Sequence, residues 1–386
     1  VIIATPHYSH TTLGVDALQN GLHVLVEKPL SVHKADCERL LAAHRSHSQV
    51  FGAVFQLRTE SKYRKLKDLI QSDELGEIVR FSWIITDWYR TEAYYSSGGW
   101  RATWRGEGGG ALLNQCPHNL DMVIWLLGKP QRVRGFCQMG RYHNIEVEDN
   151  VTAYLEWPNG ATGVFITSTG EAPGSNRLEI AGERGKVVLE AGKMTFTRNT
   201  ESMIHFGKTS KAGFAKPEVW NIDIPFDNSP AVHSDIAQNF VNAILDGVGL
   251  IAPAAEGAHS VELANAILYS SMEGKTIELP LDAVAYERRL QKLVAESKHK
   301  KPPVQKTSED FSKSFNRRQH SRLGSGPLGG VGFRDPIASR RVTRVFPRKP
   351  VNRRPRVLRC RGLPLNAANP RSEEHTSELQ SHSDLV

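Results

Sequence analysis

Lys28 stands where a parallel sheet would present a ligand-binding residue. It lies in Glu27-Lys28-Pro29, directly after the apolar run 23–26. In an open α/β sheet ligands bind beyond the carboxyl ends of the strands, and a proline restricts the residue before it to extended backbone. A lysine fixed beside a cationic ligand gives up its proton more easily, which suits proton transfer during oxidation of a hydroxyl group. The alternative is a solvated lysine at a strand end, and the three-residue motif by itself favours that alternative.

A second candidate group follows the three glycines at 108–110. If the segment is helical, Asn114, His118 and Asp121 lie at i, i+4 and i+7 on one face of the helix. Pro117 cannot donate a helical hydrogen bond, so the pattern predicts a kink or a late helix start at that point. A histidine on a polar face suits general acid–base work near neutral pH. A buried, hydrogen-bonded histidine without a catalytic role is an equally good interpretation of the motif taken alone.

The segment 88–105 combines aromatic residues with arginines. Aromatic faces stack on sugar rings, and guanidinium groups bind carboxylate, phosphate or hydroxyl groups. The alternative is a loop packed over the core by its tryptophans, which we favour for Trp88 and Trp104 and less for Trp100 and Arg101. The segment is therefore a candidate ligand-binding loop.

These candidates need a scaffold, and residues 1–56 indicate part of a doubly wound α/β domain. Short apolar runs alternate with segments whose apolar residues repeat at helical spacing. Strands and helices that alternate this tightly form a parallel sheet covered by helices. We predict strands at 1–4, 23–26 and 50–55, with helices from about residue 9 and after Ser31 between them.

Residues 57–297 indicate a second, α+β domain with an open, mainly antiparallel sheet. Its strand patterns alternate apolar and polar residues, and Pro158-Asn159-Gly160 joins two of them as a hairpin. The predicted strands lie at 77–87, 151–157, 162–169, 178–181 and 186–190, and the predicted helices at 61–71, 113–127, 231–246 and 255–271.

Residues 298–386 differ from the rest of the chain in composition. They hold 20 Lys and Arg against 7 Asp and Glu, whereas residues 1–297 hold 29 against 34. Pro, Arg, Ser and Gly dominate, so we expect a disordered segment without a core. The stretch 371–381 resembles a translated sequencing adapter, so our interpretation is a non-native tail. The alternative is a native tail that binds anionic partners.

Composition also excludes several classes of protein. No apolar run is long enough to cross a bilayer, so we expect no membrane partner. The four cysteines are scattered without paired spacing, so we expect no disulfide framework, no metal site and a reducing compartment, the cytoplasm. The basic excess belongs to the tail, and the acidic remainder gives no reason to expect a nucleic-acid partner.

Together the motifs resemble the Gfo/Idh/MocA oxidoreductases, the family of glucose–fructose oxidoreductase and inositol dehydrogenase. The resemblance covers about residues 1–298 and runs in order along them, although no single motif is specific. It rests on Thr5-Pro6-His7-Tyr8-Ser9-His10, on 21–29, on the triple-glycine segment with Asn114 and His118, on 255–266 and on Ile277-Glu278-Leu279-Pro280.

The resemblance implies a Rossmann domain followed by an α/β domain, with NAD or NADP as the cofactor. The open sheet of the second domain often forms the oligomer interface in this family, so a homo-oligomer, a dimer or tetramer, is expected. The residues expected to line the dinucleotide are Thr5, Pro6, His10, Glu27 and Lys28, with Trp100 and Arg101 reaching it from the second domain.

The resemblance also implies catalytic roles. Lys28 matches the family's lysine at the reacting carbon, and His118 matches its active-site histidine. Asn114 stands where the family often has Asp, and asparagine cannot carry a relay charge, so a hydrogen-bonding role is expected, as in some sugar-nucleotide members. We therefore expect an NAD(P)-dependent oxidoreductase acting on a hydroxyl or keto carbon of a carbohydrate (a sugar, glycoside or cyclitol). The residues expected to bind the substrate are Tyr89, Arg90, Asn114 and His118.

Two other functions stay open as alternatives. One is a hydrolase or lyase that uses NAD in a transient redox cycle. The other is a non-catalytic sugar-binding relative, against which the intact Glu27-Lys28-Pro29 and His118 argue.

By the resemblance, the chain begins at the family's fourth strand. Roughly 60–70 residues, two strand–helix units that include the dinucleotide fingerprint, would then precede it. The G-x-G-x-x-G at 324–329 has no strand before it and is interrupted by Pro327, so it is assigned no function. We accordingly expect the chain as given to be inactive.

Overall fold

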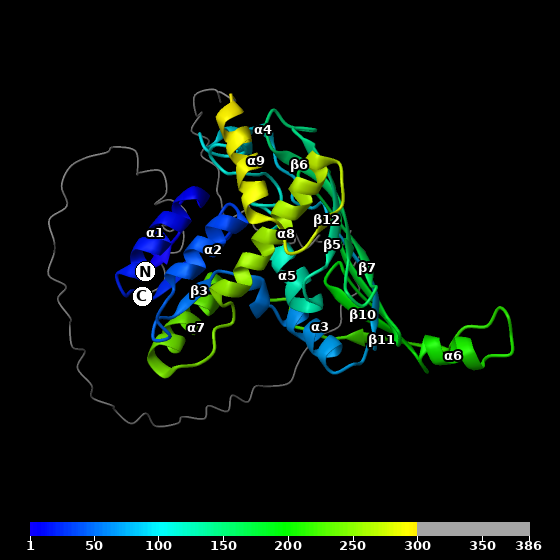
Figure 1. The fold of residues 1–386 in the computed structure, drawn as a ribbon. Helices are drawn as coiled ribbons and strands as arrows, with labels where there is room; N and C mark the ends of the chain where they lie inside the picture. The colour runs from blue at the N-terminus through cyan, green and yellow to red at the C-terminus, as the bar shows by residue number, and fades with distance from the viewer. Residues whose placement is uncertain (299–386) are drawn as a thin grey trace, which may run out of the picture. The chain divides into compact units, whose positions relative to one another are not determined.

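Two β-sheets organise the chain, and a computed structural model describes them over residues 1–298 (Figure 1). The first sheet has three strands and the second has nine. The tail expected to be disordered lies outside the described residues from residue 299 onward, and with it the adapter-like stretch and the glycine pattern. None of the helices between residues 1 and 298 combines the length and the apolar composition needed to cross a membrane.

The first sheet is the parallel sheet that the sequence predicts. Its strands, in spatial order, are β1 (Ile2–Ile3), β2 (Val24–Val26) and β3 (Phe51–Ala53), and both neighbouring pairs are parallel. Helices α1 (His7–Gln19) and α2 (Lys34–Ala43) form the connections between the strands. The alternation of strand and helix confirms the Rossmann architecture of this part.

Successive side chains of β2 serve opposite faces of this sheet. Val24 and Val26 pack on the side covered by α1 and α2. Leu25 packs on the other side with Phe240 of α7 (His233–Asp246). Because side chains alternate along a strand and both faces are covered, the strand consists of consecutive apolar residues.

A late segment of the chain returns to the first sheet. Ala53 N donates to the carbonyl oxygen of Ala252 over 3.0 Å, and Gly52 forms an isolated bridge with Pro253. Together with α7, this segment covers the first sheet, although the predicted boundary assigns it to the second domain. The division after residue 56 stays a prediction, and the structure adds that part of the cover comes from beyond it.

The second sheet is mixed, and among the described strands β4 and β7 form its one parallel pair. The predicted open, mainly antiparallel sheet is thus confirmed. In spatial order its strands are β11 (Val219–Ile224), β10 (Lys193–Asn199), β9 (Gly185–Glu190), β8 (Asn176–Gly182), β4 (Ile78–Ile85), β7 (Thr162–Ser168), β6 (Glu148–Glu156), β5 (Arg132–Met139) and β12 (Ile277–Glu278).

Helices cover one face of the second sheet, as Figure 1 shows for α5 and α8. Phe81 and Trp83 of β4 and Phe165 of β7 are fully buried on that side. On the opposite face, Phe136 of β5 and Tyr154 of β6 are exposed. The covering helices are α3 (Ser61–Gln71), α5 (Pro117–Leu127), α8 (Ala254–Glu273) and α9 (Ala283–Glu296).

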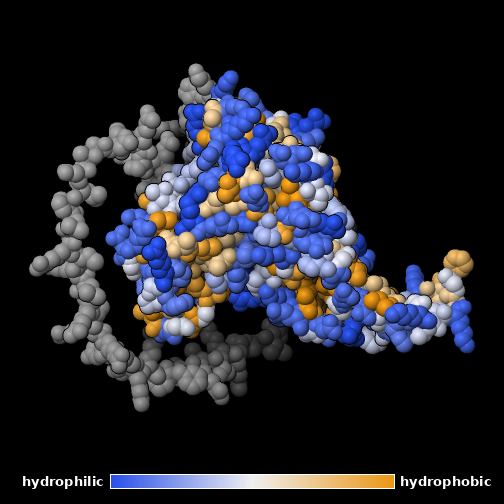
Figure 2. Space-filling view, in the orientation of Figure 1, coloured by the Kyte–Doolittle hydropathy of each residue, from blue (hydrophilic) through white to orange (hydrophobic). Residues whose placement is uncertain are grey.

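Three short helices complete the described chain. They are η1 (Gln56–Thr59), α4 (Glu92–Ser96) and α6 (Met203–Thr209). Helix α6 lies in an extension between β10 and β11, away from the covering helices (Figure 1). The extension exposes Ile204 and Phe214, and Figure 2 shows apolar surface at its tip.

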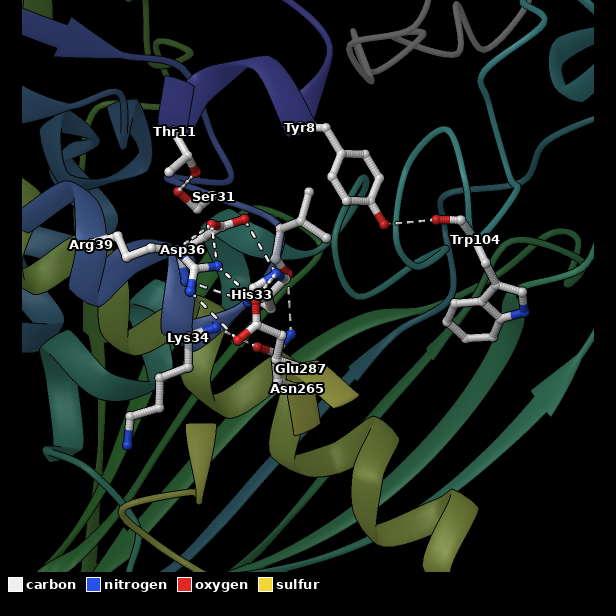
Figure 3. Close-up of polar contacts among 11 residues, drawn as sticks. Tyr8, Thr11, Ser31, His33, Lys34, Asp36, Arg39, Trp104, Asn265 and Glu287 are labelled. Carbon is white, nitrogen blue, oxygen red and sulfur yellow. Dashed lines mark hydrogen bonds and ion pairs between the residues drawn. The ribbon is translucent and has the colours of Figure 1, made fainter. Parts of the chain in front are cut away.

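Polar contacts fasten the amino end of α2 to the helices of the second sheet (Figure 3). The guanidinium of Arg39 bridges Asp36 of its own helix and Glu287 of α9, at 2.6 and 2.8 Å. Lys34 N donates to Asn265 Oδ1 of α8 over 2.9 Å. Because α2 follows β2, these bonds also fix the loop between them relative to α8 and α9.

Candidate active site

The structure brings Lys28 and Asn114 together at the carboxyl edge of the first sheet. Lys28 follows β2 after one residue, and its Nζ donates a hydrogen bond to the carbonyl oxygen of Asn114 over 3.0 Å. Both residues are half-buried. The strand-end lysine therefore meets the segment after the glycine run through the backbone of Asn114.

The helix after the glycine run starts too late to place Asn114 on its face. Helix α5 begins at Pro117, and Asn114 lies in the preceding turn, where its N–H donates to the carbonyl oxygen of Gly110 over 2.9 Å. Proline lacks the N–H that an interior helical position donates, whereas the first position needs none, so the helix begins there. The predicted late start of the helix is confirmed. The prediction that Asn114 lies on one helical face with His118 and Asp121 is wrong, because Asn114 precedes the helix.

His118 lies in the first turn of α5, against the end of the first sheet. Its ring meets that of Phe55 edge-on, with centroids 5.8 Å apart. Its Nδ1 is buried and makes no hydrogen bond within residues 1–298. Burial holds the pKa of His118 well below its usual range, and the positive charges of Lys28 and His233 add to the shift. The ring is therefore neutral at neutral pH, and its Nδ1 is not occupied by any described group.

His10 ties the two strand-end loops to each other. Its buried ring has Nε2 2.7 Å from the carbonyl oxygen of Thr5 and Nδ1 2.9 Å from that of Pro29. Burial lowers the pKa of His10, and a neutral ring can donate to only one of these two oxygens. Since both nitrogens face the backbone, the expected contact of His10 with a dinucleotide stays a prediction.

Two oxygen-bearing side chains stand at the same edge, where Pro6 precedes α1 as its N-cap. The hydroxyl of Thr5 is buried and has no hydrogen-bond partner within the described residues. Glu27 accepts from Lys28 N over 3.2 Å and lies 3.6 Å from Nε2 of His233. A buried polar group without a partner is costly, so Thr5 fits a ligand that completes its hydrogen bonding.

A loop attached to the second sheet brings Trp100 and Arg101 to α1. The indole of Trp100 meets the ring of His7 edge-on, with centroids 5.8 Å apart. The guanidinium of Arg101 lies over the rings of Trp100 and Tyr94, at 4.7 and 4.9 Å, and donates to the Tyr94 hydroxyl over 3.1 Å. Because cations stack favourably on aromatic faces, these side chains form one stacked group.

Arg90 joins this stacked group, whereas Tyr89 does not. The guanidinium of Arg90 lies over the rings of Trp88 and Tyr94, at 5.5 and 5.1 Å from their centroids. The side chain of Tyr89 is half exposed. The expected substrate contacts of Arg90 and of Tyr89 both stay predictions.

Tyr94 and Glu107 are site residues that the sequence did not single out. The carboxylate of Glu107, only 2% exposed, accepts from the side-chain amide of Asn114 and, over 2.6 Å, from Ala102 N. The hydroxyl of Tyr94 accepts from Arg101 and from Gln115. The aromatic character of segment 88–105 could have indicated Tyr94, but an acidic residue before a glycine run belongs to no recognisable motif.

Glu148 of β6 binds the backbone of the glycine run. Its two carboxylate oxygens accept from Gly110 N and Leu112 N, both over 2.9 Å. Burial raises the pKa of Glu148 to about 7, although these two bonds oppose the shift. A Cβ atom at Gly110 would lie 2.1 Å from the carbonyl oxygen of Glu148. Only glycine therefore lets the run approach β6 closely enough for both bonds.

The residues that converge at this edge suit proton transfer to a ligand rich in hydroxyl groups. They comprise a lysine, a neutral histidine, an amide and a stacked aromatic–guanidinium group. In the part of the chain that the structure describes, no three His, Cys, Asp or Glu side chains are grouped as a metal ion would need.

Two family models match the chain. The model described as "Oxidoreductase family, NAD-binding Rossmann fold" matches residues 1–55. The model described as "GFO/IDH/MocA C-terminal domain" matches residues 63–188. The two matches follow each other along the chain in the same order as the two sheets.

Curated relatives span different shares of their own length. Levoglucosan dehydrogenase of Pseudarthrobacter phenanthrenivorans is 24% identical, over 72% of this chain and 80% of that protein. Trans-1,2-dihydrobenzene-1,2-diol dehydrogenase of Bos taurus is 28% identical, over 48% of this chain and 53% of that protein. The uncharacterized oxidoreductase YdgJ of Escherichia coli is 32% identical, over 49% and 52%. The match thus spans four-fifths of the first relative and about half of the other two.

Solved structures share the fold. The WlbA dehydrogenase of Bordetella pertussis, in complex with NADH and UDP-GlcNAcA, is 26% identical with a TM-score of 0.59, covering 73% of this chain and 79% of that chain. Levoglucosan dehydrogenase in complex with NADH is 19% identical with a TM-score of 0.61, covering 73% and 80%. At 19% identity, the likeness to the levoglucosan dehydrogenase structure concerns the fold alone.

Proposed function

Since this chain belongs to the Gfo/Idh/MocA family of NAD-binding oxidoreductases, we propose that it interconverts a hydroxyl and a keto carbon of a carbohydrate with NAD or NADP. The observation that carries the proposal is the meeting of three groups at one sheet edge. They are the Lys28 ammonium, the Asn114 carbonyl that accepts from it, and His118 with its unpartnered ring nitrogen.

The carboxyl edge of the first sheet fits the nicotinamide end of a dinucleotide. It presents the unpartnered Thr5 hydroxyl after β1, and Trp100 stacked near α1. Lys28, Glu27, Pro6 and Arg101 are the other residues that would hold the dinucleotide. When bound, the nicotinamide supplies or accepts the hydride of the reaction. No strand–glycine loop–helix unit occurs within residues 1–298, so the pyrophosphate contacts are not assigned to described residues.

Lys28 is the proposed acid–base residue. Its Nζ is held by the Asn114 carbonyl, so its position is fixed relative to the sheet edge. In the oxidation direction its neutral amine takes the proton of the substrate hydroxyl and becomes the ammonium, and in the reduction direction the ammonium returns that proton to the new alcohol. An ammonium group carries three N–H donors, so it can hold the Asn114 carbonyl and contact a substrate hydroxyl at the same time.

His118 and Asn114 are the proposed partners of Lys28. The buried, neutral imidazole of His118 can hydrogen-bond a substrate hydroxyl without bringing a second positive charge beside Lys28. Asn114 contributes its carbonyl oxygen, and its side-chain amide is engaged with Glu107 and with the hydroxyl of Tyr94. A positioning and hydrogen-bonding role of Asn114 therefore replaces a charge relay.

The proposed substrate is a sugar, glycoside or cyclitol. The stacked group of Trp88, Arg90, Tyr94, Trp100 and Arg101 offers flat apolar faces and guanidinium donors side by side, the combination that sugar rings with their hydroxyls require. Relatives with sugar-acting names, levoglucosan dehydrogenase among them, support this class.

A homo-oligomer, a dimer or tetramer, is also proposed, with the open face of the second sheet as its interface. Phe136 and Tyr154 stand exposed on that face. Exposed aromatic residues on an uncovered sheet face are typical of a surface that another chain covers. Sedimentation of the purified chain and of Phe136→Glu tests the proposed oligomer, and a parent that sediments as a monomer contradicts it.

The described cysteines are free thiols, which supports a reducing compartment such as the cytoplasm.

Turnover with a panel of sugars, glycosides and cyclitols, each with NAD and NADP, tests the proposed function. The chain is assayed as it is and fused to the first two strand–helix units of a relative, which supply a pyrophosphate site. Substrate-dependent reduction of the dinucleotide by either protein supports the proposal. Release of an aglycone without net reduction would identify the redox-cycle hydrolase instead. Binding of sugars without either reaction in both proteins would identify a non-catalytic relative.

A further inference from the structure

Glu107 is a buried carboxylate that joins two segments of the proposed active site. One carboxylate oxygen accepts from the side-chain amide of Asn114, and the other accepts from Ala102 N over 2.6 Å. Its carbonyl oxygen lies 3.2 Å from Nδ1 of His7 on α1. Burying a carboxylate is costly unless its oxygens are hydrogen-bonded, so bonds from both oxygens to the site are a defined arrangement.

The bond to Ala102 supports a strained backbone. Ala102 has a φ of +52° and is fully buried. Left-handed backbone is unfavourable for a residue with a Cβ atom and persists only where the surroundings fix it. Ala102 directly follows Trp100 and Arg101, so the bond from its N–H to Glu107 also sets the path of those two residues.

The bond to Asn114 fixes the orientation of an amide. With Nδ2 donating to Glu107, the Oδ1 atom of Asn114 is left to accept from Tyr94 and Gln115, at 3.4 and 3.3 Å. The opposite orientation would turn the carbonyl oxygen of the amide toward the carboxylate, which repels it. The backbone carbonyl of the same residue receives Lys28 Nζ.

We propose that Glu107 is a positioning residue of the active site, which holds the Lys28-binding turn at Asn114 and the Trp100–Arg101 segment in place through one buried carboxylate. The inference rests on the proposed function for its relevance to turnover. The contact itself is testable without turnover, because the same bonds can be rebuilt with the charge on the other partner.

The test is a charge exchange between the two contacting side chains. Glu107→Gln alone either loses the bond to Ala102 or to Asn114, or keeps both only if the Asn114 amide turns over and gives up its bonds from Tyr94 and Gln115. Asn114→Asp alone brings two buried carboxylates into contact. In the double variant, Glu107→Gln with Asn114→Asp, the new amide would accept from Ala102 N and donate to the new carboxylate, which restores both bonds. Glu190→Gln, which removes an exposed carboxylate of β9, is the control.

Unfolding in urea and hydrogen–deuterium exchange are measured on the full chain. Each single variant is expected to raise the unfolding equilibrium constant by about tenfold or more, and the double variant to restore it to within about threefold of the parent. Exchange in peptides that cover residues 100–107 and 111–116 should quicken in both single variants and slow again in the double variant. Additive effects of the two substitutions, or exchange that is unchanged in the single variants, would overturn the inference.

Turnover decides whether the positioning matters for the reaction. In whichever protein turns over a sugar, the single variants are expected to lose about tenfold or more of kcat, with recovery in the double variant and no change in Glu190→Gln. Single variants that keep kcat within about threefold would overturn the inference even if the bonds are coupled. If no sugar is turned over, the proposed function fails, and the unfolding and exchange results alone decide on the positioning role.

Discussion

Arg58 and Asp121 form a buried, bidentate ion pair, in which Nε and Nη2 of Arg58 lie 2.8 and 2.6 Å from the two carboxylate oxygens of Asp121. Both side chains are only 3% exposed. Arg58 lies three residues after Phe55, the residue that His118 touches, and Asp121 lies three residues after His118 on α5. The ion pair therefore links the end of the first sheet to the helix that carries the active-site histidine.

Asp121→Ala is expected to destabilise the protein by about 3–5 kcal/mol, because it leaves the Arg58 guanidinium buried without that partner. Urea unfolding measures the loss. Glu190→Ala is the matched control, since Glu190 pairs with Arg177 over 2.6 Å at an exposed position. That control should cost no more than about 1 kcal/mol. Equal losses in the two variants would mean that the buried pair does not link the two elements.

Lys28→Met is expected to reduce turnover by about a thousandfold, because it removes the proposed acid–base group and its exchangeable proton while keeping most of the stem. Dinucleotide affinity, measured by calorimetric titration, should change far less. Lys186→Met, an exposed lysine of β9, is the control. Turnover of Lys28→Met within a few-fold of the parent would show that another group transfers the proton.

His118 gives the stability of the protein a dependence on acid pH. Its folded pKa lies below the ordinary 6.5, mainly because burial disfavours the imidazolium. As pH falls below 6.5 the unfolded chain takes up this proton first, so the contribution is present above 6.5 and is lost toward acid. The difference in unfolding free energy between parent and His118→Gln should therefore shrink as the pH is lowered. The exposed His205→Gln serves as control, and parallel curves for His118→Gln and the parent would contradict the prediction.

Glu148 makes the stability of the protein depend on pH in the opposite direction. Burial raises its folded pKa from 4.5 to about 7, so the folded protein holds this proton more tightly than the unfolded chain. The resulting stabilisation is complete below 4.5 and is lost as the pH rises through about 7, by about 3 kcal/mol in total. Glu148→Gln should remove this slope, at the cost of one backbone bond. If the unfolding free energy of Glu148→Gln kept the parent's dependence on pH, another group would be its source and the prediction would be wrong.

Gly110→Ala is expected to destabilise the protein by about 2–3 kcal/mol, because the new Cβ atom would lie 2.1 Å from the carbonyl oxygen of Glu148. Thermal unfolding measures the change. Gly99→Ala is the control, since a Cβ atom at Gly99 meets nothing within 4 Å. Similar melting temperatures of the Gly110 variant and the parent would show that the glycine run can move away from β6.

The sequence allowed the first sheet to be predicted because its signals are local. Three short apolar runs and the helical spacings between them are complete within residues 1–56, and β2 is buried on both faces. β11 was missed although apolar and polar residues alternate over 220–224, and five of its six residues are exposed. Helix α6 of the extension was also missed, and none of its residues is buried.

At the site, residues next to a motif could be predicted and residues that depend on distant contacts could not. Lys28 directly precedes Pro29, and His118 follows the glycine run at 108–110, so each lies near a feature that can be recognised in the sequence. The role of Glu107 arises because its two carboxylate oxygens meet segments that only the folded loop brings together. The helical face expected for Asn114 failed at one residue, Pro117, whose missing N–H sets the start of α5.

The return of α7 and residues 252–253 to the first sheet limits how parts of such proteins can be exchanged. Leu25 and Val54 share a buried cluster with Ile236 and Phe240, and Ala53 N donates to Ala252. A chimaera that takes residues 1–56 from one relative and the rest from another would take the two halves of that cluster from different proteins. Side chains from different parents need not pack against each other. A recombination library built on this fold should therefore inherit the dinucleotide half and the segment 231–254 from the same parent.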